Sequence, residues 1–479
     1  MTLIKGIVWV LFVPLWHFPD EQAHFGHVAY LAEGGPLPMG RTNDLNQEIA
    51  ISEQRLGTYR NKYGNNDFTY RPDYRLEYTG SSTGKYEQEI KSLPQSLRKI
   101  YADPESAYYP HFFYRVSGFI YKLFYQQDIF VRVFSLRIFW LFTHILMVYW
   151  AYKIGQLVFV KDKLASVSVA VLTSFQPMLS FVAAGVTSDN LHNAMFTGVI
   201  YFCLRLIKRL EFKSILGLAI IMNIGLINKP QFMIAWAIVI SVLLWRWKKL
   251  LILACLIGIW LYSQGKLPHI GEGIGLGRPD YTLWQHLVYT ANHTFREVLP
   301  WYWGVFRWLS LTLPRWVNQV MMRLLLLAGI GLMIKLFRRK FEPGFWLIVW
   351  SALIYFLALF LWDFQQVRNA GFPFGIQGRY YFPVIVPHLV LMIMGIKELI
   401  PRITYYLLLI INYWFIVLNW IALYWVTASY YDTSSFKSFI IQASQYKPDF
   451  AKAGWLAAAL FLYTVLTLIF SIKLLKNEK

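Results

Sequence analysis

The sequence predicts an all-α polytopic membrane protein, with about twelve transmembrane helices and a large external loop after the first of them. Two observations carry this prediction. The chain is 57% hydrophobic and only 15% charged, whereas a soluble protein carries about a quarter charged residues. The apolar residues also form long blocks that short basic clusters separate. We therefore expect residues 1–479 to form one integral membrane domain.

The first apolar block, residues 3–16, is similar to a signal peptide. However, His17, Phe18 and Pro19 follow it in place of a small-residue cleavage site. We interpret residues 3–18 as an uncleaved first span. A span needs about 20 residues, so either this one tilts little or the true start lies upstream.

The other apolar blocks predict the remaining spans. They lie at 134–158, 164–185, 190–207, 214–228, 231–245, 250–263, 320–336, 344–362, 380–396, 403–426 and 454–472. With the N-terminus in the cytoplasm, every compact basic cluster falls on the cytoplasmic side, as the positive-inside rule requires. Both termini are then cytoplasmic, and the opposite side receives the loops 19–130, 264–319, 363–379 and 427–453.

The charge, cysteines and glycines exclude other classes. The net charge of +20 lies mostly in short loops between apolar runs, which indicates membrane topology and not a nucleic-acid partner. Cys203 and Cys255 each lie inside an apolar run, so they suggest neither a disulfide framework nor a metal cluster. The glycines of 270–277 are not a nucleotide fingerprint, because no strand precedes them; we expect a flexible loop.

Both ends of the first external loop mix aromatic, aliphatic and polar residues. Segments 22–34 and 107–127 therefore predict juxtamembrane amphipathic helices that lie on the membrane surface. The stretch HFPDEQAHFGH, residues 17–27, places Asp20 and Glu21 where the first span ends. Acids are favoured in a first helical turn, so these two can simply cap the helix that begins near Gln22. They can also provide a general base.

Two histidines in this stretch leave a further alternative open. His24 and His27 lie at helical spacings from the acids and can join Asp20 or Glu21 as metal ligands. Packing at the membrane interface is the more frequent role of such histidines.

Further polar sets fall at span ends on the same external face. They are Asp189 with Asn190, His192 and Asn193, then Asn228 with Lys229 and Pro230, and finally Asp363, Arg368, Gln377 and Arg379. Singly, each has a structural explanation: Asp189 can cap a span, Lys229 can snorkel, and Arg379 can anchor a span at the headgroups. Together, ionisable residues at span ends indicate a functional site. Carboxylates and cations on one wet face suit an enzyme that activates a hydroxyl and binds a phosphate.

The order of the motifs adds a resemblance. The motifs are Pro19-Asp-Glu21, Tyr108-Tyr-Pro-His-Phe-Phe-Tyr114, Phe130-Val-Arg-Val-Phe-Ser135, Ser188-Asp189, Lys229-Pro230 and Gly378-Arg-Tyr380. The chain resembles the GT-C superfamily, the multi-span glycosyltransferases that use lipid-phosphate-linked sugars. Within it, the chain is most similar to a large bacterial family of multi-span membrane proteins. It is more distantly similar to protein O-mannosyltransferases and the lipid A aminoarabinose transferase. Many relatives read His-Pro-Pro where this chain has Tyr109-Pro110-His111.

The resemblance implies an inverting glycosyltransferase with a polyprenyl-phosphate-sugar donor. Asp20 would be the general base, and Glu21 would orient the acceptor or share that role. The substrate-binding residues that it implies are His24, Arg137, Asp189, Lys229, Arg368, Gln377, Arg379 and Tyr380. Arg132 is a lesser candidate for the phosphate. Some relatives need a divalent cation and others do not, so a divalent cation stays open as a cofactor.

The same resemblance implies location and partners. The enzyme would lie in the plasma (inner) membrane among membrane lipids, with its active site on the external face. Its acceptor would be an envelope glycan, lipid or protein. A transporter or flippase for a lipid-linked glycan is an alternative, but it predicts inverted repeats and broken helices near the midplane, and the sequence shows no repeat. An envelope polysaccharide polymerase shares the external site and the substrates, and it stays open.

Overall fold

The computed structural model describes the whole chain except residues 36–43, 104–109, 247–279, 374 and 477–479. Its helices are α1 (Thr2–Phe12), α2 (Glu21–Ala32), α3 (Gln47–Leu56), α4 (Ser81–Lys91), α5 (Phe112–Leu123), α6 (Ile129–Val158), α7 (Lys163–Phe175), α8 (Pro177–Ala183), α9 (Ser188–Lys208), α10 (Phe212–Asn228), α11 (Ile234–Arg246), α13 (Leu283–His293), α14 (Leu299–Trp303), α15 (Arg315–Arg338), α16 (Phe345–Ala370), α17 (Ile385–Leu399), α18 (Thr404–Tyr430), α19 (Phe436–Ala443) and α20 (Ala453–Lys476). Antiparallel pairs join β1 (Leu45–Asn46) to β2 (Tyr101–Asp103) and β3 (Val305–Phe306) to β4 (Leu311–Thr312).

Each predicted span within the described residues overlaps a helix, and the predicted span 164–185 is divided between α7 and α8. In the part of the chain that the structure describes, six helices are long and apolar enough to cross a membrane, and there are seven if α7 and α8, bent by 59°, form one span. Shorter apolar helices, among them α1 and α10, match other predicted spans. The predicted span 250–263, the glycines of 270–277, Tyr108, Tyr109 and the first part of the loop 264–319 lie outside the described residues. The predicted number of about twelve spans stays a prediction.

Two predicted boundaries are wrong. The first helix ends at Phe12 and not at residue 18, because Val13 is extended (φ −84°, ψ 127°) ahead of Pro14, as residues before proline prefer to be. The helix α16 continues to Ala370 and ends on Gly371 at φ 81°. The predicted loop 363–379 therefore starts as helix, and Asp363 and Arg368 lie on its last turns.

The two predicted amphipathic helices differ from each other. In α5 the side chains of Phe119 and Leu123 are exposed while Phe113 and Tyr114 are buried, as the prediction requires. In α2 every residue from Glu21 to Tyr30 is buried, since α5 and β1 pack against it. The prediction that this segment lies on a membrane surface is wrong.

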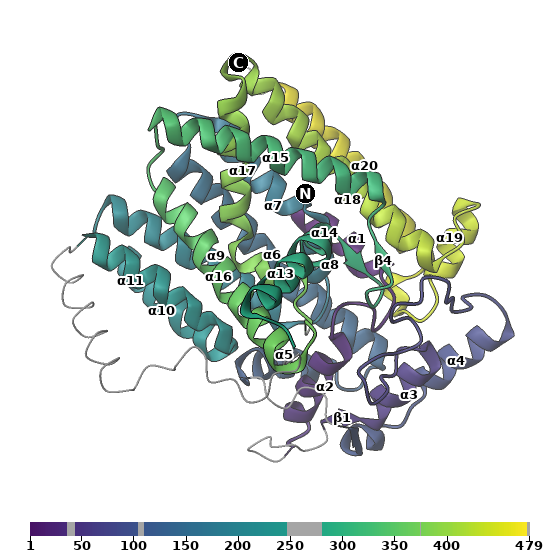
Figure 1. Ribbon diagram of the computed structural model, residues 1–479. Coiled ribbons are helices and arrows are strands. Elements are labelled where there is room, and N and C mark those ends of the chain that lie inside the picture. Colours follow the sequence, from purple (N-terminus) through teal and green to yellow (C-terminus); the bar gives the residue numbers. More distant parts are fainter. Residues whose placement is uncertain (36–43, 104–109, 247–279, 374, 477–479) are drawn as a thin grey trace, which may run out of the picture.

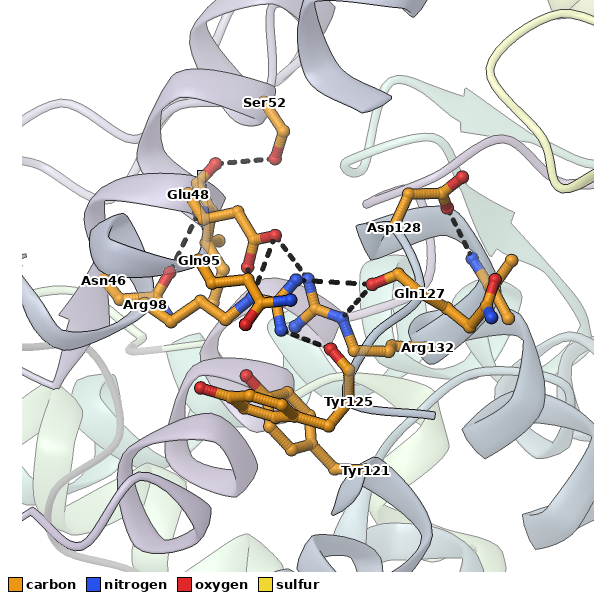
Figure 2. Close-up of polar contacts among 12 residues, drawn as sticks. Asn46, Glu48, Ser52, Gln95, Arg98, Tyr121, Tyr125, Gln127, Asp128 and Arg132 are labelled. Carbon is orange, nitrogen blue, oxygen red and sulfur yellow. Dashed lines mark hydrogen bonds and ion pairs between the residues drawn. The ribbon is translucent and has the colours of Figure 1, made fainter. Parts of the chain in front are cut away.

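The long helix α6 packs against α1, α7 and α9 and keeps one apolar face exposed, with Phe142 and Tyr149 on it. At one end of the bundle, the purple elements α2, α3, α4 and β1 of the first predicted loop gather together (Figure 1). A buried ion cluster joins α3 and the 3₁₀ turn Gln95–Lys99 of this loop to α6. Figure 2 shows that Arg98 and Arg132 both donate to the carboxylate of Glu48, and that Arg132 Nε also donates to the carbonyl of Gln127 at 3.2 Å. Arg132, the lesser candidate for the phosphate, is part of this cluster. The geometry of Arg132 is therefore that of a structural residue.

Candidate functional site

Asp20 lies in the turn between α1 and α2, where its φ of 54° is unusual for a residue other than glycine. Its side chain makes no capping bond to α2. Instead, Asp20 Oδ2 accepts from Arg379 Nη2 at 2.6 Å and Oδ1 accepts from Arg60 Nη2 at 3.2 Å. Burial raises the pKa of the Asp20 carboxyl, but Arg379 and Arg60 outweigh that effect and hold the pKa well below its ordinary value. Asp20 is thus an ionised carboxylate whose two oxygens face two cations.

Arg379 is only 5% exposed and lies in a 3₁₀ turn, Gly378–Val384, that leads into α17. The turn packs directly on α14. A Cβ atom at Gly378 would lie 2.1 Å from the backbone nitrogen of Tyr302, so only glycine allows this approach. The Gly-Arg sequence therefore has a physical explanation: the glycine permits the close packing that brings the arginine next to Asp20.

A second carboxylate–cation pair lies nearby. Asp189, in the first turn of α9, accepts a short hydrogen bond from Lys229 Nζ. Thr187, and not Asp189, is the residue that caps α9. Lys229 is extended between α10 and the turn that begins at Pro230. The helix break therefore places the ammonium group beside the carboxylate, where it is 9% exposed.

His24 lies close enough to both pairs to sense their charges. Its Nδ1 lies 2.8 Å from the hydroxyl of Tyr114, and its Nε2 lies 3.1 Å from the hydroxyl of Thr187. Burial lowers the pKa of His24 to about 4. The charges of Asp20 and Asp189 oppose this shift, and those of Lys229 and Arg379 reinforce it. Within the described part of the chain, no three His, Cys, Asp or Glu side chains are grouped to hold a metal ion.

Two cavities meet at Arg379, which lines both. The helix-walled cavity, of about 110 Å³, is lined by Asp189, His192, Lys229, Tyr355, Trp362 and Tyr380. The loop-walled cavity, of about 150 Å³, is lined by His17, Asp20, Arg60, Arg307, Trp308 and Gln377. The first is bounded by α9, α16 and the break after α10. The second is bounded by the turn before α2, the loop after α3, the helix α8 and the segment that begins at β3. Arg379 thus lies between one cavity that is walled by helices and one that is walled mainly by loops.

His192 adds an unsatisfied group to the helix-walled cavity. The side chain is 3% exposed, and neither ring nitrogen has a hydrogen-bond partner in the described structure. Buried polar groups are normally paired. A ligand or water in this cavity would supply the missing partner.

Glu21 and Arg137, both site candidates, are bound to each other. They form a fully buried ion pair, with Arg137 Nε and Nη2 at 2.7 and 2.5 Å from the two carboxylate oxygens. The same guanidinium donates to the carbonyls of Val10, Val13 and Pro14. These bonds fix the turn that carries Asp20. Neither Glu21 nor Arg137 lines either cavity. The geometry is that of positioning residues, and it does not favour direct substrate contact by either side chain.

Arg368 is also apart from the site. It is half-buried on α16, with its guanidinium 6.0 Å from the ring centre of Phe364, and it lines neither cavity. Asp363 is paired with His293 Nδ1 at 2.7 Å. The predicted contribution of Arg368 to phosphate binding therefore receives no support from its position.

Residues 3–387 match the family model described as predicted membrane protein (DUF2142). The chain belongs to this family. Two crystal structures of ArnT from Cupriavidus metallidurans are similar to it. The apo structure has 14% identity and a TM-score of 0.38, covering 98% of this chain and 74% of that chain. The structure bound to undecaprenyl phosphate has 15% identity and a TM-score of 0.34, covering 77% and 66%. Such TM-scores support no conclusion about this chain. No curated protein matches the sequence.

The DUF2142 match includes the whole site, from Asp20 to Tyr380. Family membership confirms the prediction of a multi-pass membrane protein. The loop-walled cavity also contains three residues that the sequence did not indicate as site residues: Arg60, Arg307 and Trp308. Arg60 is one of several basic residues in a long loop, and nothing local distinguishes the one that folds onto Asp20.

Proposed function

We propose that the protein is a membrane glycosyltransferase that moves a sugar, with inversion, from a polyprenyl-phosphate donor to an envelope acceptor. Its active site would lie on the external face of the plasma (inner) membrane. The observation that carries the proposal is the position of Arg379. This buried cation lines both cavities and contacts Asp20, the carboxylate that we propose as the acceptor of the proton.

The helix-walled cavity suits the donor. A lipid donor keeps its tail among apolar helices, and this cavity is bounded by α16 and by the break after α10. Lys229 and Arg379 supply two cations for the phosphate, opposed by Asp189 alone. An apolar groove of about 320 Å³ between α15, α16 and α17 reaches Tyr381, next to Tyr380 of the cavity. The tail can follow this groove.

The chemistry is a single displacement. The acceptor hydroxyl oxygen attacks the anomeric carbon, and the bond from that carbon to the phosphate oxygen breaks. The electron pair leaves with the phosphate, while the hydroxyl proton passes to Asp20. Lys229 and Arg379 stabilise the second negative charge that develops on the phosphate, a kind of electrostatic contribution that is often the largest in catalysis.

The test uses the purified full chain in detergent, a panel of polyprenyl-phosphate hexoses and pentoses, and a cell-envelope extract as acceptor source. We expect release of polyprenyl phosphate. Lys229→Gln should lower that release about 10²-fold, the scale for losing one preorganised charge. Lys340→Gln, at an exposed position far along the chain, is the matched control. A folded protein that consumes no donor would contradict the proposal, and transport in liposomes would then be measured.

A further inference from the structure

The loop-walled cavity has an unusual balance of charge. Its lining contains three guanidinium groups, from Arg60, Arg307 and Arg379, and one carboxylate, from Asp20. Gln377, Asn65 and Thr69 add neutral polar groups to the wall. Such a lining suits a hydroxyl-rich molecule that also carries a negative charge.

Two of these arginines have a free donor. Arg307 is 1% exposed, and its terminal nitrogens donate to the carbonyls of Pro72 and Tyr74. Its Nε has no partner in the described structure, and neither has Nε of Arg379. A buried charged donor without an acceptor is costly. An anionic group beside Arg307 would supply the acceptor that its Nε lacks, while the Nε of Arg379 is left for the donor phosphate of the proposed function.

The wall that carries Arg307 is held in a strained conformation. Arg307, Trp308 and Leu309 have φ angles of 53°, 53° and 62°, a left-handed conformation that costs about 1–2 kcal/mol per residue. Two bonds retain it: Trp308 Nε1 donates to the carbonyl of Trp16 at 3.0 Å, and Tyr70 N donates to the carbonyl of Trp308 at 3.3 Å. Strain of this kind is typical of ligand-binding sites. Here it places Arg307 in the cavity wall and Trp308 beneath the guanidinium of Arg60, at 5.1 Å.

We infer that the loop-walled cavity binds the acceptor as an acidic glycan, through a carboxylate or phosphate substituent held by Arg60 and Arg307. This inference rests on the proposed function, because it names the acceptor of that reaction. A hydroxyl of the same glycan then lies next to Asp20.

Each arginine partner of Asp20 would then contact one substrate. Arg379 would contact the donor phosphate from the helix-walled cavity, and Arg60 would contact the acceptor anion in the loop-walled cavity.

Three sugars that differ only at C6 test the charge preference: glucose, glucuronate and glucose 6-phosphate. Saturation-transfer NMR on the full chain in detergent, titrated to millimolar sugar, gives the affinities. We expect at least one anion to bind about ten-fold more tightly than glucose, and the better anion identifies a carboxylate or a phosphate. Equal binding of glucose, or no saturable binding of either anion, would overturn the inference.

Variants place the binding in this cavity. Arg60→Gln should remove the preference for the anion, and so should Arg307→Gln if that variant folds. Arg307→Lys keeps the positive charge but replaces the planar guanidinium group and its paired donors. Arg55→Gln is the control, because Arg55 lies on the same predicted loop, is paired with Glu89 and lines neither cavity. Anion binding that persists unchanged in Arg60→Gln would place it elsewhere and overturn the inference. Donor cleavage without any charge preference would contradict this inference alone. Anion binding without donor cleavage would contradict the proposed function instead.

Discussion

Arg379 Nη2 lies 2.6 Å from Asp20 Oδ2, although 359 positions separate the two residues in the sequence. The contact joins the acidic turn after the first helix to the turn that leads into α17. It also explains how one carboxylate can serve two cavities, because Arg379 lines both. The site depends on this pair, and the first prediction concerns its acid.

Asp20→Asn should abolish transfer while leaving the fold intact. The side chain makes no capping bond, so its charge can be removed without loss of a helix end. A missing general base lowers turnover about 10²–10⁴-fold. Sugar transfer and circular dichroism of the same preparation measure the two effects. Asp449→Asn, at a side chain that is 91% exposed, is the control; full turnover in Asp20→Asn would exclude Asp20 as the base.

His24 should make stability depend on pH. Its pKa of about 4 lies below the ordinary 6.5, so between these values the unfolded chain binds more protons than the folded one. Stability therefore falls as pH drops from 6.5 to about 4 and levels off below, by a few kcal/mol. His24→Gln removes this titration. From pH 7.5 to 4, the melting temperature of the wild-type protein should fall by more than that of His24→Gln, and parallel curves would refute the assignment.

Arg137→Gln should destabilise the protein and not act through the substrate. The change leaves Glu21 buried and unpaired, and breaking such a pair typically costs about 3–5 kcal/mol. Folded yield and melting temperature in detergent measure the loss. Arg368→Gln makes the same charge change at a half-buried position outside both cavities and should leave both quantities unchanged. A well-folded Arg137→Gln protein with weakened donor binding would instead make Arg137 a phosphate ligand.

The sequence predicts the helices well because apolar runs are local signals. Each predicted span in the described part of the chain overlaps at least one helix. Charges at span ends indicate the acidic turn and Lys229. The long-range pairs are different. Arg60 reaches Asp20 only after the first predicted loop folds onto the bundle end, and no local pattern encodes that approach. The burial of α2 was missed for the same reason, since α5 and β1 cover it from distant positions.

Gly378→Ala should disrupt the site through packing alone. The new methyl group would lie 2.1 Å from the backbone nitrogen of Tyr302 and 2.3 Å from its Cα, and backbone atoms cannot move aside as a flexible side chain can. The turn must shift away from α14, which carries Arg379 away from Asp20. We expect donor turnover to fall at least ten-fold, because small displacements of catalytic groups have large effects. Gly84→Ala is the matched control: a Cβ there meets nothing within 4 Å, and alanine within a helix such as α4 adds about 0.5–1 kcal/mol of stability. Turnover in Gly378→Ala equal to that of the control would mean that Arg379 does not depend on this packing.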